Sequence, residues 1–99
     1  MTTTITYEQA RDRVRAEVGP TWNRGTFCID DRTIVENEEM YVFEVGAREF
    51  LKDGDPNFEI LGPVTTVSKT DGRVTSLPSV QVATDPSITR RSNPSPTFA

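Results

Sequence analysis

The apolar positions near the start of the chain repeat with helical spacing. They fall three or four residues apart, and the positions between them are mostly charged or polar, which is typical of an amphipathic helix. The repeating positions are Tyr7, Ala10, Val14 and Val18. The pattern predicts a helix from Tyr7 to Val18, which needs a surface to pack on because twelve residues make a marginal helix in water.

Both ends of this helix carry recognisable signals. Thr6 precedes it and Gln9 stands three residues later, the arrangement of a capping box. Gly19 and Pro20 follow it; glycine tolerates the left-handed backbone of a helix end, and proline cannot continue a helix.

The next apolar positions alternate, as in strands with one buried face. Tyr41, Phe43 and Val45 fall on one side of a predicted strand, and Met40, Val42 and Glu44 fall on the other. The predicted strands are residues 26–29, 33–36, 39–45, 63–69 and 73–77. After a turn at residues 30–32, residues 33–36 are either a short continuation of the first strand or a separate edge piece, and Asp71-Gly72 is a strong hairpin signal between the last two strands. We therefore expect an α+β fold with the N-terminal helix packed on a four- to five-stranded antiparallel sheet.

The remaining segments are less regular. Residues 47–52 fit one helical turn, and residues 53–57 form a turn cluster. Five apolar residues around them are too many for a free loop and are expected to fold over one edge of the sheet: Phe50, Leu51, Phe58, Ile60 and Leu61. Val80 and Val82 fit a short strand. Residues 85–99, rich in Ser and Pro, are expected to be a disordered tail, so the predicted domain is residues 4–84.

The expected core combines the inward positions of the helix and the strands. It comprises Tyr7, Ala10, Val14, Val18, Phe27, Ile29, Tyr41, Phe43, Val45, Val67 and Val74.

Composition excludes several classes of function. The chain has 99 residues, one cysteine and no histidine, so zinc sites built from Cys and His, and catalysis by Ser-His-Asp or Cys-His, are excluded. There is no apolar run long enough to cross a bilayer and no secretory signal at the start. We expect a cytoplasmic protein without cofactor or metal.

The net charge of −4 is unevenly distributed. Residues 30–59 hold ten acidic and three basic residues, a net charge of −7, and the segments on either side are slightly basic. This argues against nucleic acid as a partner and favours a basic protein partner, although solubility alone also explains acidic residues.

Three chemical signals have ordinary structural explanations. Asp53, Asp55, Asn57 and Glu59 alternate like the start of a calcium loop, but the sixth and twelfth positions lack the Gly and Glu that such a loop needs. Cys28 has no histidine to activate it. Paired carboxylates could serve acid–base catalysis, but Glu36, Glu38 and Glu39 fall at a predicted loop and strand start, where a solvated turn is the ordinary explanation, and we expect no enzyme.

Six segments, in order, carry a resemblance to a known family. They are Ile5-Thr6-Tyr7-Glu8-Gln9-Ala10, Asp31-Arg32-Thr33-Ile34-Val35-Glu36, Tyr41-Val42-Phe43, Phe50-Leu51-Lys52-Asp53-Gly54-Asp55, Leu61-Gly62-Pro63-Val64 and Asp71-Gly72-Arg73-Val74. The chain resembles the YrhB-like family of small bacterial proteins, also classed as immunity protein family 35, over roughly residues 5–77. The resemblance implies a cytoplasmic, non-enzymatic α+β protein that neutralises a toxin; it carries over no catalytic or contact residue.

The functional hypothesis is stoichiometric binding and inhibition of a protein, such as a basic bacterial toxin domain, through an acidic face. The residues expected to form that face are Glu36, Glu38, Glu39, Glu44, Asp53 and Asp55. Two alternatives stay open. One is a small-ligand carrier with a cavity lined by Phe43 and Phe58, and the other is a phage or secretion assembly adaptor whose tail orders on its partner. The sequence leaves the oligomeric state undetermined.

Overall fold

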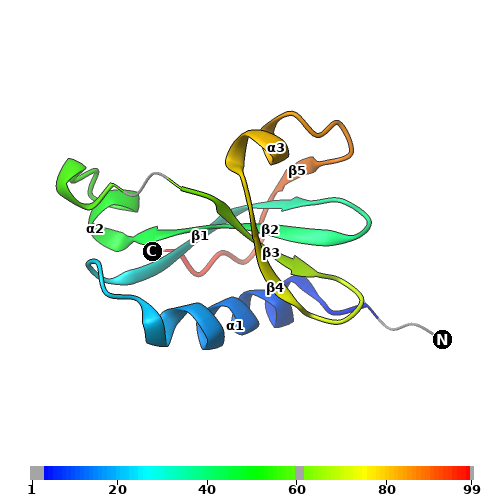
Figure 1. The fold of residues 1–99 in the computed structure, drawn as a ribbon, viewed down its shortest axis with the longest axis horizontal. Helices are drawn as coiled ribbons and strands as arrows, with labels where there is room; N and C mark the ends of the chain where they lie inside the picture. Colours follow the sequence, from blue (N-terminus) through cyan, green and yellow to red (C-terminus); the bar gives the residue numbers. More distant parts are fainter. Residues whose placement is uncertain (1–3, 60–61, 99) are drawn as a thin grey trace.

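A computed structural model describes residues 4–59 and 62–98. Its elements are α1 (Tyr7–Val18), the 3-10 turn η1 (Gly19–Thr21), β1 (Phe27–Glu36), β2 (Met40–Ala47), α2 (Arg48–Leu51), the 3-10 turn η2 (Pro56–Phe58), β3 (Val64–Ser68), β4 (Val74–Leu77), α3 (Ser79–Ala83) and β5 (Thr89–Ser92). Within the described residues the strands form one five-stranded antiparallel sheet in the order β4-β3-β2-β1-β5. Helix α1 lies along one face of the sheet and α3 lies on the other (Figure 1). The predicted α+β fold is confirmed.

Helix α1 has the bounds and the start that the sequence predicts. The Gln9 amide donates to Thr6 Oγ1 at 3.1 Å, and the Thr6 amide donates to Gln9 Oε1 at 2.8 Å, which completes the capping box. The expected left-handed Gly19 is wrong, because its φ is −52°. Pro20 instead sits in the short turn η1, which carries the chain on in a tighter right-handed conformation.

The main core lies between α1 and the sheet. The ring of Tyr7 stacks on Phe43 with centroids 5.0 Å apart and meets Tyr41 edge-on at 5.6 Å. The buried members are Tyr7, Ala10, Val14, Ile29, Ile34, Tyr41, Phe43 and Val67, and the partly buried members are Ile5, Val18, Phe27, Val45 and Val74. All eleven predicted core residues are therefore in this cluster. Ile34 was missed because residues 30–32 were predicted to be a turn.

Strand β1 corrects that predicted turn. Residues 27–36 form one strand, but its register against β2 shifts between Asp30, which pairs with Glu44, and Val35, which pairs with Val42. The irregularity keeps the chain extended where Asp30-Asp31-Arg32 looked like a turn. Ordinary alternation places the Asp31 side chain on the same side of β1 as the buried Ile29, where it is fully buried, and the irregularity returns Ile34 to that side.

The β3–β4 connection confirms the predicted hairpin. Gly72 has a φ of +72°, and an added Cβ there would lie 2.6 Å from Arg13 Nε. The positive φ is what favours glycine at this turn, because the flexible Arg13 side chain could move away from an added Cβ.

A second, smaller core lies on the opposite face of the sheet. Val42, Val82 and Ile88 are buried there. Val82 belongs to helix α3, so the short strand expected around Val80 and Val82 is wrong. A five-residue helix places Val82 on the sheet and leaves Val80 exposed.

The expected disordered tail is also corrected by the structure. Residues 89–92 form strand β5 on the outer edge of β1, with Thr33 opposite Ser92 and Glu36 opposite Thr89. The amides of Thr97 and Phe98 then bond to the Asp31 carboxylate. The composition did not predict that residues 89–98 are ordered, because strand pairing and polar contacts hold them and little apolar surface is buried. Residues 1–3, Ile60, Leu61 and Ala99 lie outside the described residues.

Candidate functional site

The face of the sheet opposite α1 carries a cavity of about 470 Å³, which we call the groove. Val42 and Glu44 of β2 lie on its floor, because they alternate with the buried Phe43. The groove is closed at one end by Phe50, Leu51 and Phe58 and at the side by Val82, Ala83 and Arg90. Its volume lies within the range of small-molecule and peptide-binding sites.

Glycine at position 46 shapes one end of the groove. A Cβ at Gly46 would lie 3.2 Å from Leu51 Cδ1, so its absence lets Leu51 of α2 approach the strand. Phe50, Leu51 and Phe58 thus pack on the sheet as the sequence predicts, but at the end of the inner strand β2 and not over an edge of the sheet. Phe43 does not line the groove as expected, since it is buried beneath α1.

The charges in the groove are of both signs. Asp30 pairs with Arg32, whose Nη2 lies 2.7 Å from Asp30 Oδ2. Glu44 lies opposite Asp30 across the strand pair and makes no side-chain hydrogen bond or ion pair with any described residue. Burial and the neighbouring Asp30 charge raise the pKa of Glu44, and Arg32 offsets part of that rise.

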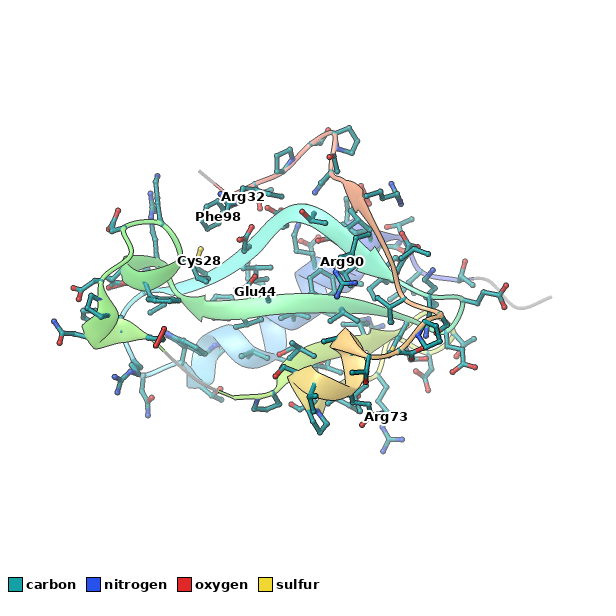
Figure 2. All side chains as sticks on the ribbon, turned by 90° about the horizontal axis from the view of Figure 1, so that it is seen from above. Cys28, Arg32, Glu44, Arg73, Arg90 and Phe98 are labelled. Atoms are coloured by element: carbon teal, nitrogen blue, oxygen red, sulfur yellow. The ribbon has the colours of Figure 1, made fainter. Side chains whose placement is uncertain are left out.

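Arg90 completes the polar part of the groove. It lies on β5 and, within residues 4–59 and 62–98, its guanidinium has no carboxylate in ion-pair range. Figure 2 shows Glu44 and Arg90 over the same face of the sheet. Besides its apolar side chains and the Asp30–Arg32 pair, the groove therefore carries one carboxylate, Glu44, and one guanidinium, Arg90, that form no ion pair with a described residue. Sequence reasoning missed Arg90 because it falls in the expected disordered tail.

The six acidic residues predicted as one face are not brought together. Glu36 accepts bonds from Lys69 at 2.8 Å and Arg91 at 3.1 Å, and these bonds, led by that from Lys69, lower its pKa despite partial burial. Glu38 and Glu39 are exposed in the β1–β2 turn.

The other predicted acidic residues lie elsewhere. Asp53 is exposed after α2, and Asp55 caps η2 by accepting the Asn57 amide at 3.0 Å. The eight residues of β2 span about 25 Å, so the turn and α2 lie at opposite ends of the sheet (Figure 1). Of the six, only Glu44 lies in the groove.

The structure gives Asp55 and Cys28 ordinary roles. The cap on η2 occupies Asp55, and among the described residues no three or more acidic or Cys side chains gather in a way that could hold a metal ion. Cys28 is half-buried; burial, more than its charged neighbours, raises the pKa of its thiol. A raised pKa keeps the thiol protonated and weakly nucleophilic.

Comparisons with known proteins found no matching family model, curated protein or solved structure. None of the helices in the described part of the chain has the length and apolar character required to traverse a membrane.

Proposed function

We propose that this protein is a non-enzymatic binding domain that docks a protein partner in the groove. The observation that supports the proposal is Glu44, a carboxylate without a partner among the described residues, set beside apolar side chains in a cavity of about 470 Å³. Glu44 is exposed to solvent in the groove, so a cationic group from a partner can reach its carboxylate and form a charge-assisted hydrogen bond with it.

The groove favours a partner segment with a Lys or Arg side chain flanked by apolar residues. The cation would meet Glu44, while the apolar residues would cover Val42, Leu51 and Phe58. Buried central contacts of this kind carry most of the affinity at protein interfaces. The exposed Glu38 at the end of the sheet would instead raise the rate of association with a basic partner.

The resemblance to the YrhB-like family supplies a biological setting for this proposal. It implies a cytoplasmic inhibitor that binds a bacterial toxin stoichiometrically. A basic toxin domain would complement both the net negative charge of residues 30–59 and the Glu44 carboxylate in the groove.

The test compares two isosteric variants in affinity capture from the source cell. Glu44→Gln removes the groove carboxylate, and Glu38→Gln/Glu39→Gln removes two charges outside it. We expect the wild type to capture a specific partner. Glu44→Gln should fail to capture that partner or should bind it at least tenfold more weakly. The double variant should bind it with a lower association rate and an unchanged dissociation rate. A partner that binds all three forms alike, or responds only to the double variant, contradicts docking in the groove.

A small zwitterionic ligand is the second candidate. It is favoured by the presence of Glu44 and Arg90 in one cavity of suitable volume, because an ammonium and a carboxylate on one molecule would meet both charges. Titration of the ¹⁵N-labelled protein with leucine, N-acetyl-leucine and leucine amide tests it. Shifts at groove residues with leucine alone would favour this candidate over a protein partner.

A further inference from the structure

Away from the groove, the Asp31 carboxylate is fully buried at the irregular part of β1. Arg11 of α1 reaches it, with Nη1 3.1 Å from Asp31 Oδ2. The Arg11 side chain is itself only 11% exposed, and its Nε is buried without a partner. A buried carboxylate of this kind needs several donors, because one guanidinium bond leaves most of its lone pairs unsatisfied.

The missing donors come from residues 93–98, which we call the 93–98 arm. The Thr97 amide donates to both carboxylate oxygens, at 3.0 and 2.9 Å, and the Thr97 hydroxyl donates to Oδ2 at 2.6 Å. The Phe98 amide donates to Oδ1 at 2.9 Å. Two consecutive backbone amides and one hydroxyl therefore converge on a single carboxylate.

Contacts on either side fix the direction of the 93–98 arm. The Phe98 ring lies beneath the Arg32 guanidinium, 4.4 Å from its carbon to the ring centroid (Figure 2). At the other end, Asn93 Nδ2 donates to the Asp31 carbonyl at 2.7 Å and the Asn93 amide donates to the Arg32 carbonyl at 2.9 Å. The surface thus contacts a hydroxyl residue followed by an aromatic residue.

These polar contacts are the main interactions that hold the 93–98 arm on the domain. Residues 94–97 are exposed, and Asn93 and Phe98 are only partly buried. Burial raises the Asp31 pKa, but the bonds from Thr97 and Phe98 together with Arg11 outweigh it and hold that pKa below its ordinary value. A segment with few apolar contacts opens locally at a lower free energy than the core, so we expect the arm to detach while the domain stays folded.

We propose that Arg11, Asp31 and Arg32 form a peptide-binding site, which we call the Asp31 cradle, and that it accepts the 93–98 arm of a second copy of this chain in place of its own. Every contact that the arm makes with the cradle comes from a group on the arm itself, so the arm of a second copy can make the same contacts. The 93–98 arm follows β5 directly, with no loop between them, and short hinges favour exchange of a segment between copies. The chain's own arm competes for the cradle at an effective concentration on the order of millimolar. The arm of a second copy therefore rarely replaces it in the wild type.

Two full-length variants test the proposal by complementation. Thr97→Pro removes the amide and the hydroxyl that Asp31 binds but leaves the cradle intact. Asp31→Asn removes the cradle's charge but leaves the arm intact. Each variant alone is expected to be monomeric by analytical ultracentrifugation at 200 μM, whereas an equimolar mixture forms a one-to-one complex, in which the arm of the second variant occupies the cradle of the first.

A labelled peptide keeps the test decisive if Asp31→Asn fails to fold. A fluorescent peptide of residues 92–98 is titrated into folded Thr97→Pro protein, with the same peptide carrying Ala at position 97 as the control. We expect the Thr peptide to bind at least tenfold more tightly than the Ala peptide. Equal binding of the two peptides, no binding of either, or a mixture that stays monomeric although both variants are folded overturns the proposal.

Discussion

Asp31 and Glu44 lie on neighbouring strands, and the chain surrounds their carboxylates in opposite ways. Asp31 is fully buried and accepts bonds from Arg11, Thr97 and Phe98. Glu44 lies in the groove beside another acid and has no partner among the described residues. The pKa of Asp31 is lowered and the pKa of Glu44 is raised.

The contrast separates acidic residues that hold the fold from one that is free to bind. The carboxylates of Asp31 and Glu36 accept hydrogen bonds from other residues of the chain, and these bonds lower the free energy of the folded state. Glu44 lies opposite Asp30, and like charges directly opposite on a sheet are destabilising. A residue kept at some cost to stability is a better candidate for function than one that stabilises the fold.

The largest expected effect follows from replacing the buried carboxylate. Asp31→Ala leaves Arg11 buried without a counter-charge and releases the 93–98 arm, so we expect the free energy of unfolding to fall by about 3 kcal/mol. Urea denaturation measures it. Asp30→Ala is the matched control; its partner Arg32 is 58% exposed, and the expected loss is below about 1 kcal/mol. Similar losses for the two variants would mean that Asp31 is not specially stabilising.

The two carboxylates should also respond oppositely to pH. Because the pKa of Asp31 is lowered in the folded state, its stabilisation is complete above the ordinary value of 3.8 and is lost as the pH falls through the lowered pKa. The pKa of Glu44 is raised, so its ionisation costs stability above the raised pKa, and that cost disappears below the ordinary value of 4.5.

Denaturation of the wild type, Asp31→Asn and Glu44→Gln between pH 7 and pH 3 measures this contrast. The difference between wild type and Glu44→Gln is expected to vanish first as the pH falls, and the difference for Asp31→Asn is expected to shrink only at lower pH. The reverse order would show that the two environments have been assigned wrongly.

A smaller effect of opposite sign is expected at Glu44. Glu44→Gln removes the like-charge contact with Asp30, so the free energy of unfolding should rise by up to about 0.5 kcal/mol at pH 7. Glu36→Gln weakens bonds from Lys69 and Arg91 and should lower it by about 1 kcal/mol. Thermal denaturation of both variants is the measurement. Destabilisation by Glu44→Gln would indicate that the carboxylate has a stabilising contact after all.

The helix, the β2 strand and the hairpin were predictable because their signals are local. The capping box at Thr6, the alternation around Phe43 and the turn at Gly72 each depend on residues within a few positions. The same alternation predicted that Glu44 lies on the face opposite Phe43, which is where the structure has it.

The 93–98 arm and the rest of the groove were not predictable from local patterns. Asp31 bonds to Thr97, 66 positions away, and Arg90 enters the groove only because β5 pairs with β1. Neither relation leaves a periodic apolar signal, since both depend on backbone pairing and charge. The Ser- and Pro-rich composition of the segment pointed to disorder for the same reason.

The smallest expected effect concerns the aromatic contact of the 93–98 arm. Phe98→Leu keeps an apolar side chain but removes the ring beneath Arg32, a contact worth about 0.5 kcal/mol at an exposed site. The amides of Thr97 and Phe98 donate to Asp31 and should exchange with solvent about two- to threefold faster in this variant, as measured by hydrogen exchange with NMR detection. The amide of Phe43 in the core serves as the internal control and should be unaffected. Faster exchange at both places would mean that the arm opens only when the whole domain unfolds, and then the Asp31 cradle and the core would be one cooperative unit.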